Sequence, residues 1–444
     1  MSENGARAGV DVEAPVRIAA SWVGAWRVAG VIGALALGAA GYGMWRDPTR
    51  FAAAFLFSFY TFLSIALGAL FFVLVQHLTK AEWSVTVRRA SEFLMAGIPV
   101  FLVLVIPILA TTSRLYPWDG VPRAHETVQA GAFANGRDEG DREPYALRVA
   151  NSNAGPSIER AARVEDARVL DAKRRYMNRS FFALRAIVYL FIWSLIALRL
   201  FRWSTKQDEA RSNASTLRAS RFAPAAMVAF AITVCLAAFD WLMSLDARWS
   251  SSAFGLYVFA GCAVAHAAAI VPFTRLLQRG GLGRHHVTVE HYHDLGKWLF
   301  GWISFWAYLA YVQFFLAWYA NLPEEISFFH ARWGDSLGSY KPLSVALIVF
   351  HFLVPFWLLL SRHAKRSPKA LLAGAVVVLT MHVAEAYWLV MPNFGPLAVH
   401  WLDVACFVGV GGVYAAAVLR VVEKHALVPI GDPRLARALA FENG

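Results

Sequence analysis

Acidic side chains and histidines interrupt several long apolar runs of this sequence, and they are its clearest candidates for chemistry. The set comprises Asp240, Asp246, His266, His351, His382, Glu385 and Asp403. A charged side chain deep in a bilayer costs roughly 3 kcal/mol on insertion scales, so such residues face a protein interior and often mark ion or proton routes. Arg185 also lies in an apolar run, but near its end, where a long side chain is expected to reach the membrane surface.

One pair among these residues has a spacing that favours proton transfer. His382 and Glu385 stand three residues apart, so they share one face of a helix and could relay a proton or hold a chain of water molecules. For this pair and for Asp240, hydrogen bonding between helices is the structural alternative. For His266 and His351 the alternative is a histidine satisfied within the core.

A stripe of small hydroxylated residues follows one face of the second apolar run. It consists of Ser58, Thr61 and Ser64, is extended by Gly68, and points towards His77 at the end of the run. Such a stripe could conduct protons, but small residues also let helices pack closely.

The composition is that of a polytopic membrane protein. Of the 444 residues 58% are hydrophobic and only 16% are charged, with a mean hydropathy of +0.46, whereas soluble domains have about a quarter of their residues charged. The net charge of +12 could suggest nucleic acid, but basic residues at the ends of apolar segments act as orientation signals. We therefore expect no nucleic-acid partner.

Ten apolar runs are long enough to cross a bilayer, which requires about 20 helical residues. They are 23–45, 51–76, 91–112, 181–202, 222–246, 253–277, 297–320, 342–361, 370–391 and 398–421. The predicted organisation is an N-terminal segment (1–22), three helices (23–112), a long hydrophilic loop (113–180), seven helices (181–421) and a tail (422–444). Within the loop, the charged pattern from Ser157 onward predicts a short surface helix.

Most Lys and Arg residues of the short connections fall on the side that carries both termini. The positive-inside rule therefore predicts cytoplasmic termini and a periplasmic 113–180 loop, since long loops escape the rule. His291, His293 and Asp294 then lie at the cytoplasmic start of the aromatic run 297–320, as candidates for proton uptake or subunit docking. We expect the chain to be organised around this stretch, from Arg284 to Ile326.

No sequence pattern supplies a redox cofactor or a metal site. Cys235, Cys262 and Cys406 lie singly in apolar runs, which excludes covalent haem attachment and a cysteine-ligated cluster within this chain. Histidines on three runs could in principle ligate a b-type haem, but no run has two histidines spaced for stacked haems. The spacing of His291 and His293 without a second cluster predicts no metal.

Four stretches of the chain resemble a known membrane family. They are HYHDLGKWLFGWISFWAYLAYVQFFLAWYANLPEE, AAFDWLMSLDARWSSSAFGLYVFAG, SFYTFLSIALGALFFVLVQHLTKAEWSVTVRRASE and LVPIGDPRL. These stretches are similar to the F-type subunits of bacterial alternative complex III, within the polysulfide-reductase-like (NrfD-like) family. The resemblance implies ten transmembrane helices, with two four-helix bundles and two extra helices, in the bacterial inner membrane.

The resemblance also implies a role in a respiratory quinol:cytochrome c oxidoreductase. The partners would be an NrfD-like sister subunit, an iron–sulfur subunit, cytochrome subunits with one or several c-type haems, and in some complexes a terminal oxidase. This chain would anchor the complex, have no redox centre of its own, and bind at most a quinone or a lipid. The proton path proposed for the family falls here on His77, Asp240, Asp246, His266, His382, Glu385 and Asp403.

Three functions are therefore open at this point. The chain could line a proton path coupled to quinol oxidation in partner subunits. It could itself bind quinol near the outer helix ends, through groups such as Asp246, His400 or Asp403. It could also be a scaffold or a transporter without a redox role.

Overall fold

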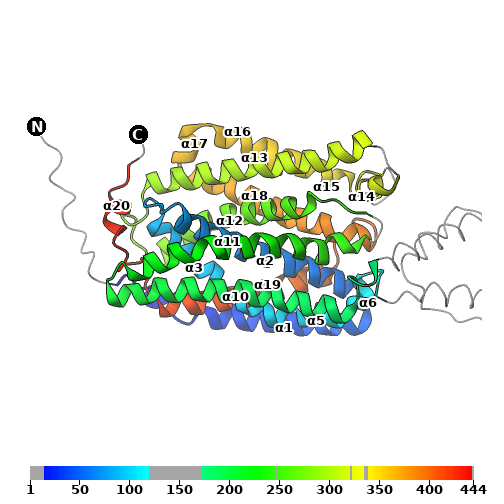
Figure 1. Ribbon diagram of the computed structural model, residues 1–444, viewed down its shortest axis with the longest axis horizontal. Coiled ribbons are helices and arrows are strands. Elements are labelled where there is room, and N and C mark those ends of the chain that lie inside the picture. The colour runs from blue at the N-terminus through cyan, green and yellow to red at the C-terminus, as the bar shows by residue number, and fades with distance from the viewer. Residues whose placement is uncertain (1–14, 120–172, 247–248, 321–322, 335–338, 443–444) are drawn as a thin grey trace, which may run out of the picture.

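The structure is a computed structural model that describes residues 15–119, 173–246, 249–320, 323–334 and 339–442. It is an all-α integral membrane protein, and the described residues contain no strand. Within these residues, ten helical spans are long and apolar enough to cross a membrane, as the sequence predicts. They run roughly side by side along the long axis of the molecule (Figure 1). The surface helix predicted from Ser157 lies outside the described residues.

The spans follow the predicted order closely. They are α1 (Ala25–Arg46), α2 (Pro48–Leu78), the segmented span from α3 (Val85–Ala96) to α5 (Ile106–Ala110), α10 (Arg179–Ala210), α11 (Ala214–Trp241), α12 (Phe254–Arg279), α13 (Val289–Ala320), the segmented span from α15 (Lys341–Ala346) to α16 (Val354–Leu360), α18 (Pro368–Val390) and α19 (Trp401–Lys424). The largest boundary differences are of eight residues: α10 ends later than predicted, and α11 and α13 begin earlier. These additional turns are polar, and hydropathy does not detect helix that extends beyond the apolar layer.

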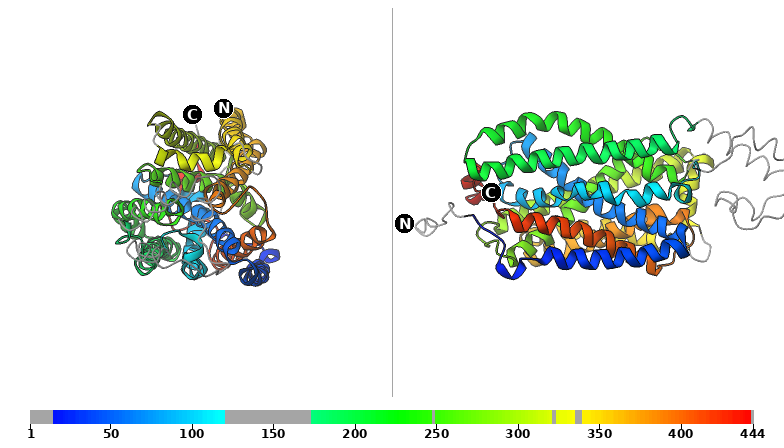
Figure 2. Two further views of the ribbon diagram at one scale, coloured as in Figure 1. Left: turned by 90° about the vertical axis from the view of Figure 1, so that its right-hand side faces the viewer. Right: turned by 90° about the horizontal axis from the view of Figure 1, so that it is seen from below.

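The helices form two four-helix groups and an extra pair. The first group contains α2, the α3 to α5 span, α10 and α11, and the second contains α12, α13, the α15 to α16 span and α18. The extra pair consists of α1 and α19, which pack against each other along their length and also contact α2 (Figure 2). This arrangement agrees with the architecture that the resemblance implies.

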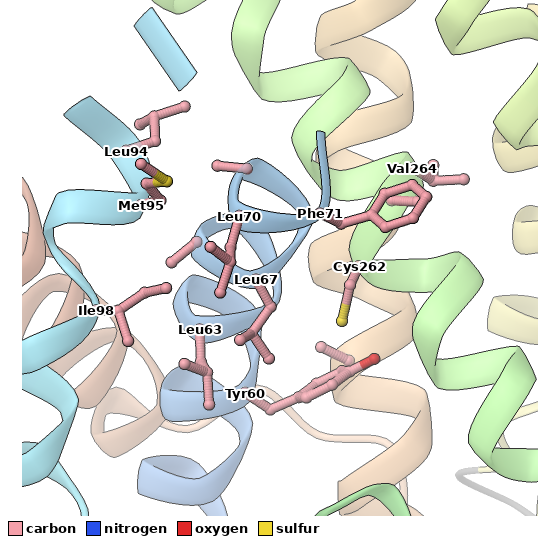
Figure 3. Close-up of a cluster of buried hydrophobic side chains, with 14 of the residues drawn as sticks. Tyr60, Leu63, Leu67, Leu70, Phe71, Leu94, Met95, Ile98, Cys262 and Val264 are labelled. Carbon is pink, nitrogen blue, oxygen red and sulfur yellow. The ribbon is translucent and has the colours of Figure 1, made fainter. Parts of the chain in front are cut away.

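Helices α2 and α12 lie at the centre of the protein and join the two groups. Almost the whole apolar length of each is buried, whereas α13 exposes much of its aromatic surface. Figure 3 shows α2 between α3 and α12, with Leu63, Leu67 and Leu70 among the packed side chains. The expectation that the chain is organised around the 284–326 stretch is therefore wrong. Hydropathy reports whether a helix suits a membrane, and not whether lipid or protein surrounds it.

Prolines divide the third span into short pieces. Between α3 and α5 lie η2 (Ile98–Val100) and α4 (Phe101–Leu104), and Pro99 and Pro107 are the second residues of η2 and α5. Proline lacks the N–H that the preceding turn would bond, so the helix is interrupted at these positions. By contrast, α12 continues through Pro272 as one helix.

The first and the last described residues lie at the same end of the bundle, which we call the terminal end; the opposite end is the far end. The backbone N–H of Leu427 donates to the carbonyl of Val16 at 2.8 Å, which ties the two ends of the chain together. The short helices α17 (Arg362–Arg366) and α20 (Leu435–Leu439) lie at the terminal end, and α6 (Thr112–Leu115) and α14 (Pro323–Trp333) lie at the far end (Figure 1).

Candidate proton-transfer site

A buried polar cluster joins five helical elements in the interior of the protein. We call it the Glu385 cluster. Its members are Ser64 on α2, Tyr257 on α12, Trp306 on α13, His351 on the π-helix η4 (Leu347–Leu353), and His382 and Glu385 on α18. All six side chains are buried. The tertiary structure thus assembles four of the residues singled out from the sequence, Ser64, His351, His382 and Glu385, with two partners that the sequence does not indicate.

The carboxylate of Glu385 is the centre of this cluster. Its Oε1 accepts a hydrogen bond from Trp306 Nε1 at 2.6 Å and another from the hydroxyl of Tyr257. Its Oε2 lies 3.2 Å from Nδ1 of His382. With 1% of its surface exposed, Glu385 relies on these partners, since a buried carboxylate without donors would be strongly unfavourable.

His382 links this carboxylate to the hydroxyl stripe on α2. Its Nε2 lies 2.7 Å from Ser64 Oγ, and the Ser64 hydroxyl is also placed to donate to the Thr61 carbonyl at 2.8 Å. The line from Thr61 through Ser64 and His382 to Glu385 is therefore continuous in hydrogen bonds. Such a line provides a route along which a proton can move without large motion of the backbone.

Two proton arrangements satisfy both contacts of the His382 ring in this line, and the second also makes the hydrogen bond from Ser64 to the Thr61 carbonyl. In the first, the Ser64 hydroxyl donates to Nε2, and Nδ1–H donates to an ionised Glu385. In the second, the Ser64 hydroxyl donates to the Thr61 carbonyl, Nε2–H donates to Ser64 Oγ, and a protonated Glu385 donates to Nδ1. The second arrangement holds one proton more than the first. Rotation of one hydroxyl and a change of histidine tautomer therefore let the line take up and release a proton.

His351 completes the cluster but has no hydrogen bond of its own. Its ring is fully buried, lies tilted against Trp306 with centroids 4.2 Å apart, and places Nδ1 3.9 Å from Glu385 Oε2. Neither ring nitrogen has a hydrogen-bond partner among the described residues. Buried polar atoms without partners are rare, and π-helical turns such as η4 are frequent at functional sites. His351 therefore marks the face of the cluster that can receive a water molecule or a proton.

Asp240, another candidate from the sequence, belongs to a separate buried ion pair. Arg185 donates to its two oxygens at 2.7 and 2.9 Å, and the Tyr189 hydroxyl donates at 2.9 Å. Arg185 is only 8% exposed and stacks on Tyr176. The expectation that Arg185 reaches the membrane surface is therefore wrong, because the sequence does not reveal a carboxylate on the adjacent helix.

The two remaining acidic candidates lie at the far end. Asp403 forms a bidentate pair with Arg50 of α2 and a capping box with His400 at the start of α19. Asp246 accepts hydrogen bonds from the backbone of Trp249 and from the hydroxyl of Ser327, both at 3.2 Å. These contacts join loops and helix ends, and they are separate from the Glu385 cluster.

Two further histidines lie between the Glu385 cluster and the terminal end. His266 is fully buried, and its Nε2 lies 3.0 Å from Ser91 Oγ, while Nδ1 has no partner among the described residues. His77, in the last turn of α2, is 5% exposed and also has an unpartnered Nδ1. They are buried polar positions along the same two central helices, but no described hydrogen bond joins them to Glu385.

The polar cluster at the start of α13 is covered rather than open. His291, His293 and Asp294 are 0%, 7% and 6% exposed, and the C-terminal tail approaches His291 through Phe441. Nδ1 of His291 accepts from the backbone N–H of Thr288 at 3.2 Å, and Asp294 pairs with Lys297. A role in proton uptake at this position therefore requires movement of the tail or a path along its edge.

A buried ionic network, which the sequence analysis does not identify, fastens that tail. Arg88 donates to Glu92 at 3.0 Å and to Asp432 at 2.7 Å, and Arg89 donates to Asp208 at 2.8 Å. Burial opposes ionisation of Asp432, but the charges of Arg88 and of nearby Arg434 lower the pKa of Asp432 well below its usual value. The only local signal in the sequence is the i, i+4 spacing of Arg88 and Glu92.

Comparison with known proteins assigns no family to this chain. No protein-family model matches the chain, and no curated protein is similar to it. Among the described residues, no group of three or more His, Cys, Asp and Glu side chains is arranged to hold a metal ion. The Glu385 cluster is therefore the feature of the structure that best indicates a function.

Proposed function

We propose that this chain is a membrane subunit that carries protons through the Glu385 cluster, in a quinol-oxidising complex of the alternative complex III type. The observation that supports the proposal is the hydrogen-bonded line from Ser64 through His382 to Glu385, buried among five helical elements. This line can hold either of two proton counts with the same heavy-atom positions. A purely structural polar contact does not require that property.

The assignment to a complex draws on the sequence resemblance. The fold, with two four-helix groups and an extra pair, is compatible with it. In this proposal the chain lies in a bacterial inner membrane with both termini in the cytoplasm. Iron–sulfur and haem partners carry the electrons, and this chain supplies the anchor and a proton route. The candidate residues for quinol binding at the far end, Asp246, His400 and Asp403, are engaged in internal contacts. The proton role is therefore preferred over quinol binding at those residues.

The test is the conversion of Glu385 to glutamine in the purified complex reconstituted into vesicles. Glutamine can still accept from Trp306 and Tyr257, so the local packing is retained, but it cannot bind and release a proton. The number of protons moved per electron is measured with a pH-sensitive dye during quinol oxidation. We expect Glu385→Gln to slow proton transfer through the cluster by about 100-fold, at the lower end of the contribution of a positioned proton-transfer group, so that the number of protons moved per electron falls.

The matched control is Glu209→Gln, which removes the same charge from an exposed position at the end of α10. It should leave the proton-to-electron ratio unchanged. A Glu385→Gln complex that assembles and moves the normal number of protons per electron would disprove the proton role. Co-purification without haem or iron–sulfur partners would disprove the assignment to this kind of complex while leaving the proton role open.

A further inference from the structure

An open groove lies on the surface of the protein between α2, α12, α18 and α19, near the terminal end. Its volume is about 790 Å³, and its lining extends from Phe62 and Ile65 near the middle of α2 to Arg279 and Arg284 at its mouth. The inner lining is apolar and includes Ala269 and Ala415. The groove is separate from the residues of the Glu385 cluster.

The charges at the groove have a single sign. Arg275, Arg279 and Arg284 all line its mouth, and none of the lining residues in the described part of the chain is acidic. The C-terminal end of α12 contributes a partial negative charge of about half an elementary charge, which three guanidinium groups outweigh. Arg279 and Arg284 are exposed. The mouth therefore favours an anionic group.

Part of this mouth is already held in position. Arg275 donates to Gln278 at 3.3 Å and lies over the ring of Tyr292, with 5.6 Å between the guanidinium carbon and the ring centroid. Gln278 in turn accepts from the Tyr292 hydroxyl at 2.9 Å and donates to the Val287 carbonyl at 3.1 Å. A group held before binding loses less freedom when a ligand arrives, which favours affinity.

The depth of the groove matches one leaflet of a bilayer. Ala269 and Arg279 are ten residues apart on α12, which corresponds to about 15 Å at 1.5 Å per residue. The hydrocarbon core of a bilayer is about 30 Å thick, so one leaflet supplies about 15 Å of acyl chain. An apolar channel of this depth beneath a basic mouth fits an amphiphile with an anionic head.

We infer that this groove binds an anionic diacyl phospholipid. Its phosphate is held by Arg275, Arg279 and Arg284, and one acyl chain follows the apolar lining towards Phe62. The lipid belongs to the leaflet at the terminal end, where basic pockets between helices commonly bind anionic headgroups. This inference does not depend on the proton role of Glu385.

The test is native mass spectrometry of the full chain after removal of lipid, titrated separately with phosphatidylglycerol, phosphatidylcholine and inorganic phosphate. Because three arginines each contribute about fivefold, we expect phosphatidylglycerol to bind about 125-fold more tightly than phosphatidylcholine, and phosphate alone to bind weakly. In the Arg279→Gln, Arg284→Gln double variant that preference should fall by about 25-fold, since each arginine near an anionic lipid contributes about fivefold.

Two comparison variants separate charge, shape and general folding. Arg218→Gln with Arg221→Gln removes two exposed charges from α11 at the same end, away from the groove, and should keep the preference. Ala415→Phe fills the apolar channel and should weaken both lipids equally. The inference is overturned if wild-type protein binds both lipids alike, if phosphate binds as well as the lipid, or if the groove variants retain the wild-type preference.

Discussion

Replacing Asp240 by asparagine separates a structural role for this residue from a proton-carrying one. The asparagine oxygen can still accept from Tyr189, but the side chain no longer balances the charge of Arg185, which is 8% exposed. Removing one partner of a buried ion pair typically costs 3 to 5 kcal/mol, because the other charge is left uncompensated. The structure determines where in that range this pair falls.

Two features place the cost near the lower limit. Arg185 also donates to the Tyr176 carbonyl at 2.9 Å, and its guanidinium lies 3.8 Å from the centroid of the Tyr176 ring. It is also only six residues from the start of α10 at Arg179, about 9 Å along the helix, so part of its charge can relax towards the surface. We therefore expect Asp240→Asn to lower the free energy of unfolding by about 3 kcal/mol.

The assay is a double-mutant cycle in detergent micelles, with unfolding followed by titration with a denaturing detergent. Arg185→Met removes the cation, so the double variant Arg185→Met, Asp240→Asn should lose no more than about 1 kcal/mol relative to wild type. A double variant as unstable as the two single variants combined would refute the ion-pair reasoning. Loss of proton movement in a fully stable Asp240→Asn protein would instead assign Asp240 a direct proton role.

Two other features of the structure lead to predictions. At Gly68 an added Cβ would lie 2.0 Å from the Cys262 carbonyl oxygen, so Gly68→Ala should push α2 and α12 apart. We expect this variant to lower the free energy of unfolding by about 1 to 3 kcal/mol in the same assay. Gly38→Ala in α1, where the added Cβ meets no atom within 4 Å, should change that free energy by less than about 0.5 kcal/mol. Equal effects at the two glycines would contradict the packing argument. Asp432→Asn should speed hydrogen exchange in residues 425–442 by about 100-fold, the equivalent of 3 kcal/mol, because it leaves Arg88 without one of its buried partners. Since the pKa of Asp432 is lowered in the folded state, the stability that this residue contributes is fully present above about pH 4 and is lost as the pH falls towards the lowered pKa. The rate of hydrogen exchange in the wild-type tail, corrected for the intrinsic exchange rate, should therefore rise only in that acid range. A tail that opens already between pH 8 and 5 would contradict this assignment.

The site could be predicted from the sequence only in part. His382 and Glu385 are recognisable because their spacing of three residues places them together on any helix. Their partners Tyr257 and Trp306 are not, because aromatic residues are common throughout the apolar runs and only helix packing selects the two that meet the carboxylate. The same limit explains why Asp240 is prominent in the sequence while its ion pair with Arg185 is not.

What the sequence determined by itself is the class of protein and the order of its spans. The length of an apolar run is a local property. Each of the ten spans must by itself be long and apolar enough to cross the bilayer, so local composition is enough to find the spans. The tertiary structure decided which spans are central, which acids are paired, and that the tail covers His291. These outcomes depend on contacts between residues far apart in the chain, such as Arg88 with Asp432, and no periodicity in the sequence encodes them.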